Sequence, residues 1–301
     1  MVASLMSALP GSVAQGLIWG ILAIGVYITY KVLDFADLTV DGSLATGGAV
    51  AVMCMLNGAN TYVALILAFL AGMLAGLVTG LFHTALGIPP ILAGILTQLG
   101  LYSINMRIMG KANQAISVMQ YDVLVSLRYI PHACLLTTGF CIVIIALLYW
   151  FFGTEIGASV RATGCNPNMA RAQGINTNAT KVLGLVISNG LVGLAGALYA
   201  QYQGSADINM GRGAIVIGLA AVIIGEVVFG KISQNFGFKL FSVAFGAIIY
   251  YLVLQVVLWM GLNSNDLKLL SALVVAVFLA IPYMKGKYFS KPVKRGGAPR
   301  A

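Results

Sequence analysis

The sequence predicts an all-α, polytopic integral membrane protein, and two observations carry this prediction. Hydrophobic residues make up 60% of the chain and charged residues only 8%, whereas a soluble domain has about 25% charged residues. In addition, no Asp, Glu, Lys or Arg occurs between Gly42 and Met106, which is typical of a segment embedded in a bilayer. Together these observations indicate several membrane-spanning helices.

Hydropathy divides the chain into about nine candidate spans, with eight or ten as neighbouring counts. A helix needs roughly 20 apolar residues to cross the hydrocarbon core. The second and seventh runs are short, so either could be broken or re-entrant. The expected spans are 13–30, 43–57, 62–82, 90–106, 131–152, 182–202, 213–229, 238–260 and 267–284.

Positive charge gathers at the C-terminal end of the chain. The formal net charge is +9, and much of it follows the last apolar run directly. Basic residues there favour the cytoplasmic side and anionic lipid headgroups, so the charge indicates a lipid partner and not a nucleic acid. Residues 1–284 are expected to form the transmembrane domain and 285–301 a basic cytoplasmic tail. The loop at 153–181 then also lies inside, whereas Arg212 falls in an outer connection and the N-terminus lies outside.

A polar segment, Glu155–Lys181, interrupts the apolar chain. Asn166 followed by Pro167 is typical of a helix N-cap with proline at the first helical position. Gly174 is suited to end the resulting two-turn helix, because glycine accepts the left-handed conformation that a helix end often needs. The segment is either a solvated connector or a short, capped helix that a partner outside the bilayer binds.

Three acids, Asp34, Asp37 and Asp41, follow the first span at spacings that would share one helix face. Asp37 and Asp41 also match the D-x-x-x-D spacing of membrane prenyltransferases, but that chemistry needs a second acidic cluster to hold Mg²⁺, and the other acids are isolated. The region is therefore interpreted as a half-helix break that lines a cavity or as a polar loop.

Glu226 lies at the inner edge of the seventh span. An intramembrane acid is a functional candidate, and the alternative is a carboxylate at the headgroup level paired with Lys231. Asn189 could line a path or hydrogen-bond between helices. The chain has no H-E-x-x-H, G-x-S-x-G or G-x-x-x-x-G-K-[ST] motif, so we expect no enzyme activity, no metal site and no bound ATP.

Gly72, Gly76 and Gly80 form a double G-x-x-x-G pattern in the third span, and Gly16 and Gly20 repeat it in the first. Small residues at this spacing allow helix backbones to approach closely. The pattern predicts helix packing within the chain, with a dimer seam as the alternative.

The sequence GASVRATGCNPNMARAQGI, followed by GLVISNGLVGLAGALYAQYQG, resembles the permease subunits of ABC importers, and more narrowly the branched-chain amino-acid and ribose permease superfamily. In that family a segment R-A-x-G-x-N-x-x-x-A-x-x-x-G-I docks on the ATPase subunit. ADLTVDGSLATGGAV is also similar to the family's I-D-L-S-V-G-S segment, with Asp41 as an insertion. The residues that the first resemblance assigns to ATPase coupling are Arg161, Gly164, Asn166, Pro167, Ala170, Arg171, Gly174 and Ile175.

The resemblance implies a type II ABC importer-like permease in a bacterial cytoplasmic membrane, with its C-terminus inside. A separate ATPase would hold ATP and Mg²⁺, an extracytoplasmic binding protein would deliver the solute, and a second permease copy, identical or related, would complete the path. The expected substrate is an amino acid, with aromatic ones as candidates. The residues expected to line the path are Asp37, Thr39, Asp41, Ser43, Asn189 and Glu226.

A stand-alone secondary transporter driven by an ion gradient is the alternative function. In that case Glu226 and the acids from Asp34 to Asp41 would carry protons or Na⁺. The polar segment discriminates between the two functions, because a secondary transporter needs no helix that docks on an ATPase.

Overall fold

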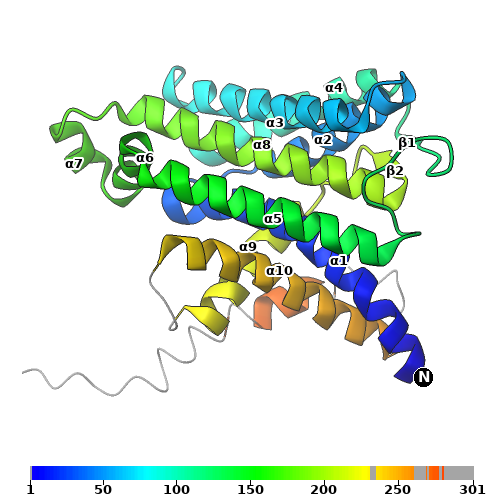
Figure 1. The fold of residues 1–301 in the computed structure, drawn as a ribbon. Helices are drawn as coiled ribbons and strands as arrows, with labels where there is room; N and C mark the ends of the chain where they lie inside the picture. Colours follow the sequence, from blue (N-terminus) through cyan, green and yellow to red (C-terminus); the bar gives the residue numbers. More distant parts are fainter. Residues whose placement is uncertain (1, 231–234, 261–268, 270, 278–279, 281–301) are drawn as a thin grey trace, which may run out of the picture.

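The structure, a computed structural model, describes residues 2–230, 235–260, 269, 271–277 and 280. It is a bundle of helices with one small two-stranded sheet (Figure 1). Two short helices, α6 and α7, lie at one end of the bundle, beyond the ends of α5 and α8, and the sheet lies at the other end. We call these the coupling end and the sheet end.

Most elements follow one another along the chain with short connections, and a longer one, 116–129, joins β1 to α5. The strands β1 and β2 pair antiparallel, with Gln114 opposite Ala206. A π-helical turn, η1, extends α1 by five residues. The bounds are α1 Val2–Tyr27, η1 Ile28–Val32, α2 Thr39–Leu56, α3 Thr61–Thr84, α4 Pro90–Met109, β1 Asn113–Ala115, α5 Ile130–Gly153, α6 Glu155–Cys165, α7 Pro167–Ala172, α8 Thr177–Gln203, β2 Ser205–Asp207, α9 Ala214–Phe229 and α10 Phe236–Trp259.

Seven helices of the described chain are long and apolar enough to cross a membrane: α1 continued by η1, then α2, α3, α4, α5, α8 and α10. The shorter apolar helix α9 corresponds to the seventh expected span. Half of the ninth expected span, 267–284, lies outside the described residues. The membrane-spanning fold is therefore confirmed, whereas the count of nine is not.

Glycine contacts explain how the centre of the bundle packs. The face of α3 that carries Gly72 and Gly76 lies directly on α8, where a side chain would collide with the backbone oxygens of Asn189 and Leu185. Gly16 of α1 meets the backbone of α10 in the same way, at Ile248. These glycines therefore pack helices within one chain, as predicted, and their faces are not available for a dimer seam.

Two helices begin near the middle of the bundle. Asp37, just before α2, is hydrogen-bonded to Asn189, which lies near the middle of the 27-residue helix α8. Asp41, in the first turn of α2, accepts hydrogen bonds from the backbone at the start of α9. From this shared level α2 runs to the sheet end and α9 to the coupling end. With 16 residues, α9 is about 24 Å long, which is shorter than a full span.

Candidate functional site

The predicted capped helix forms in the polar segment as α7. The side-chain oxygen of Asn166 accepts hydrogen bonds from the backbone N–H groups of Asn168 and Met169, both at 3.1 Å. Pro167 occupies the first turn. At the other end, Gly174 has φ +82°, and the N–H of Ile175 donates to the carbonyl of Ala170 at 3.0 Å. This is a Schellman ending, so both ends of the six-residue helix are fixed.

Helix α6, which precedes α7 and attaches it to the bundle, was not predicted from the sequence as a separate helix. The hydroxyls of Thr163 in α6 and Thr180 in α8 are 2.8 Å apart. Gly164 lies so close to the end of η1 that a side chain would collide with the carbonyl oxygen of Val32. The Arg161 guanidinium lies over the ring of Phe236, 5.9 Å from its centroid. Helix α6 therefore contacts η1, α8 and the start of α10.

The predicted coupling residues differ in exposure. Ala170 is buried, and Gly164 and Ile175 are half-buried, so these three hold the local fold. Arg171 is exposed but uses its Nε to donate to the Thr177 hydroxyl at 2.8 Å. Between these positions the side chain of Met169 is 62% exposed, which leaves an apolar group on the outer face of α7. The other predicted coupling residues, Arg161, Asn166, Pro167 and Gly174, are exposed.

Four of the six predicted path residues meet in a buried polar network, which we call the polar centre. Asn189 donates through Nδ2 to Asp37 Oδ2 at 2.7 Å, and its Oδ1 accepts from the Ser43 hydroxyl at 2.7 Å. Asp37 Oδ1 also accepts from the backbone N–H of Thr39 at 2.9 Å. The Thr39 hydroxyl lies 2.7 Å from that of Thr79. All of these side chains are buried, so they hold helices together and do not line an open space.

The acids between Asp34 and Asp41 do not share a helix face, because the chain is non-helical before Thr39. Asp34 is exposed, with φ +52°, a conformation uncommon outside glycine. Asp37 is buried, and Asp41 lies in the first turn of α2. The chain is thus broken before α2, and of the three acids only Asp41 lines a cavity.

Asp41 lines a cavity of about 240 Å³ between α2, α4 and the start of α9, which we call the central cavity. Its carboxylate accepts from the N–H groups of Gly213 and Ile215, both at 3.0 Å. The amide oxygen of Asn105, also in the lining, is buried and has no hydrogen-bond partner in the described part of the chain. The other lining residues are Gly42, Ala45, Gln98, Leu99, Tyr102, Ile208 and Arg212.

Arg212 was expected in an outer connection, but the structure brings it to the depth of Asp41. Its neighbour Gly213 donates to the Asp41 carboxylate, and Gly211 touches the Asp41 backbone. Arg212 is exposed and forms no ion pair with any described residue. A charged side chain at this depth ordinarily faces a bundle interior or a water-filled path. In the sequence, the position of Arg212 directly before a short apolar run was the feature that could have indicated its place inside the bundle.

Glu226 lies away from the polar centre. Its carboxylate is 3.0 Å from the ammonium of Lys31 in η1, and the two side chains are 38% and 40% exposed. The predicted partner, Lys231, lies outside the described residues, so the described ion pair joins α9 to η1 instead. Pairs this exposed contribute about 0–1 kcal/mol. Within the described residues, no three His, Cys, Asp or Glu side chains gather as a metal site requires.

The fold and the positions of these residues can now be compared with known proteins. Residues 9–282 match the family model described as branched-chain amino acid transport system / permease component. The chain belongs to this family. The permease is 40% identical over 275 residues to the tyrosine transport system permease protein of Clostridioides difficile (strain R20291). The matched region covers 91% of each chain. The predicted ABC permease is thereby confirmed as a transport component and not an enzyme.

Two further comparisons are more distant. The permease is 25% identical over 274 residues to the fructose import permease protein FruF of Bifidobacterium longum (strain NCC 2705), covering 88% of this chain and 74% of that one. The solved structure of PsaBC from Streptococcus pneumoniae in complex with Fab has a TM-score of 0.55 at 17% identity, with 95% of this chain and 100% of that chain covered. The latter likeness supports the fold alone.

The polar centre generates a stability prediction. Replacing Asn189 with Ala leaves Asp37 Oδ2 without its donor and the Ser43 hydroxyl without its acceptor, which should cost about 1–3 kcal/mol. We expect a lower melting temperature of the detergent-solubilised permease. The Asn178→Ala variant, changed at an exposed position near the start of α8, should melt like the wild type.

A double-mutant cycle with Ser43→Ala then tests the contact itself. Because Ser43 and Asn189 share a hydrogen bond, the combined loss should be smaller than the sum of the two single losses. Strict additivity would contradict the proposed network.

Proposed function

We propose that this chain is the permease subunit of an ABC importer in a bacterial cytoplasmic membrane, and that it conducts an amino acid delivered by an extracytoplasmic binding protein. A separate P-loop ATPase supplies the energy, holds ATP and Mg²⁺, and docks on α6 and α7. A second permease copy, identical or related, completes the path. The observation that carries the proposal is the doubly capped helix α7, which α6 connects directly to η1.

The docking surface is supported by the rigidity and exposure of α7. A short helix in water is marginal by itself, but caps at both ends and the hydrogen bond from Arg171 to Thr177 of α8 keep this one formed. Met169 offers an apolar contact, and the exposed Arg171 offers a cation. The loop that carries α7 is then cytoplasmic, as is the C-terminal tail.

A route for movement leads from the docking surface into the membrane. Gly164 of α6 touches Val32 and Leu33, directly before the break that contains Asp34 and Asp37. Asp37 in turn accepts hydrogen bonds from Thr39, at the start of α2, and from Asn189 of α8. A displacement of α6 by the ATPase would therefore reach the helix break through packed atoms, and the permease would alternate between outward- and inward-facing states.

An amino-acid substrate is supported by the central cavity and by a relative. Arg212 is suited to bind a carboxylate, and Asn105 brings an unpaired amide oxygen that could accept from an ammonium group. The printed function of the relative at 40% identity is tyrosine transport. The path would then run past Asp41 and Arg212, between α2, α4 and α9.

The ion-coupled alternative is less well supported, because each of its acids already has a structural role or lies on the surface. Asp37 holds the start of α2 and Asp41 the start of α9. Glu226 is paired with Lys31, and Asp34 is exposed.

The docking proposal predicts loss of ATPase binding in two variants. Gly174→Pro removes a residue with φ +82° that ends α7, and Arg171→Glu reverses an exposed charge; each should reduce copurification of the cognate P-loop ATPase at least several-fold. Matched controls lie at the sheet end: Gly110→Pro changes a left-handed cap of α4, and Arg128→Glu reverses another exposed charge. The docking assignment is wrong if ATPase binding survives both α7 variants.

Glu226→Gln separates the two functions. Because the Lys31–Glu226 pair is partly exposed, its loss should leave ATP-dependent uptake of L-tyrosine into proteoliposomes within about twofold of wild type, since such pairs are weak. A collapse of uptake with the ATPase still bound would instead favour the ion-coupled transporter.

A further inference from the structure

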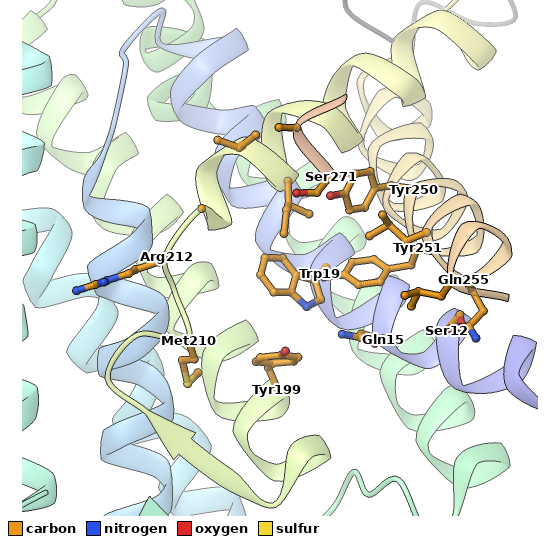
Figure 2. A pocket seen from close by; sticks show the side chains of 16 residues that line it. Ser12, Gln15, Trp19, Tyr199, Met210, Arg212, Tyr250, Tyr251, Gln255 and Ser271 are labelled. Atoms are coloured by element: carbon orange, nitrogen blue, oxygen red, sulfur yellow. The ribbon is translucent and has the colours of Figure 1, made fainter. Parts of the chain in front are cut away.

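A second cavity, of about 450 Å³, lies between α1, α8, α9 and α10, and we call it the aromatic cavity. Four aromatic side chains contribute to its wall: Trp19, Tyr199, Tyr250 and Tyr251. Figure 2 shows Trp19, Tyr199 and Tyr251 around one space, with Gln15 beside them. This volume falls in the range of small-molecule sites, whereas ordinary packing leaves few voids larger than a water molecule.

The aromatic rings of the cavity wall pack directly against one another. Trp19 meets Tyr199 edge-to-face, with centroids 5.4 Å apart, and Tyr251 at 5.8 Å in a tilted arrangement. The side chain of Trp19 is only 5% exposed, and its indole N–H has no hydrogen-bond partner among the described residues. A buried donor without a partner is costly. The wall therefore offers ring faces and a donor that an occupant could satisfy.

Among the described residues that line the aromatic cavity, only Arg212 is charged, and the same residue lines the central cavity. In Figure 2 its side chain points away from the rings, on the other side of the connection that leads to α9. Arg212 thus contributes to both linings, but its guanidinium is directed away from the aromatic rings. An occupant that matches the wall carries a flat aromatic ring and a polar group that can accept from the indole N–H of Trp19.

We propose that the aromatic cavity holds the ring of an aromatic amino acid during transport. Ring contacts with Trp19, Tyr199 and Tyr251 would select the side chain. This inference rests on the proposed function and adds to it a site within a single chain. A lipid tail fits the lining less well, because Ser12, Gln15 and Gln255 also face the cavity.

Quenching of the Trp19 fluorescence tests binding of an aromatic amino acid to the aromatic cavity, and the ATPase is not needed. The chain has three tryptophans, so replacing Trp150 and Trp259 with Phe leaves Trp19 as the only one. In that variant, 4-nitro-L-phenylalanine should quench the fluorescence saturably, and L-tyrosine but not L-leucine should reverse the quenching. A variant that keeps only Trp150, which is 70% exposed on α5, should show no saturable quenching. Lack of saturable quenching of Trp19, or equal reversal by leucine, overturns the proposal.

Transport separates this inference from the proposed function. Trp19→Leu should raise the KM for ATP-driven L-tyrosine uptake about 2- to 10-fold, the range expected for one aromatic contact, with the maximal rate nearly unchanged. Tyr27→Leu removes another buried aromatic of α1, which packs on Phe236 and lies outside the cavity lining, and should leave KM unchanged. If uptake persists and the KM of Trp19→Leu is unchanged, the cavity assignment is wrong. Failure of ATP-driven uptake in the wild type would instead reject the proposed function.

Discussion

The hydrogen bonds that Asn189 makes to Asp37 and Ser43 are the interaction on which the rest of the structure depends. They hold the break before α2 against the middle of α8, in a region where the backbone has no water to replace a missing partner. Because the break is held there, α2 starts deep in the bundle. Asp41 then meets the backbone at the start of α9, and the central cavity forms between the two helix starts.

This arrangement links the membrane interior to the surface at the coupling end. Helix α6 contacts η1 through Gly164, η1 continues α1, and the break follows at once. A π-helical turn is often found at functional sites, and here it lies between the exposed polar segment and the polar centre. The position of η1 makes it the element through which a push on α6 would change the start of α2.

Features set by local chemistry could be predicted from the sequence, whereas those set by distant contacts could not. Hydropathy alone indicates the spans, and Asn166, Pro167 and Gly174 define α7 because each acts within its own turn. Glu226 was expected either to act within the membrane or to pair with the nearby Lys231, whereas the described partner, Lys31, belongs to another helix. The aromatic cavity likewise collects Trp19, Tyr199 and Tyr251 from three helices, and no spacing in the sequence reports such a meeting.

The most direct test of this account measures ATP-driven uptake after the contact between α6 and η1 is disturbed. Gly164→Val adds a side chain where the Val32 carbonyl lies, and α7 remains intact. The account predicts that the ATPase still copurifies while L-tyrosine uptake falls at least tenfold, with Cys165→Val, an exposed neighbour, near wild type. Wild-type uptake by the Gly164→Val complex would contradict the claim that force passes from α6 to the helix break.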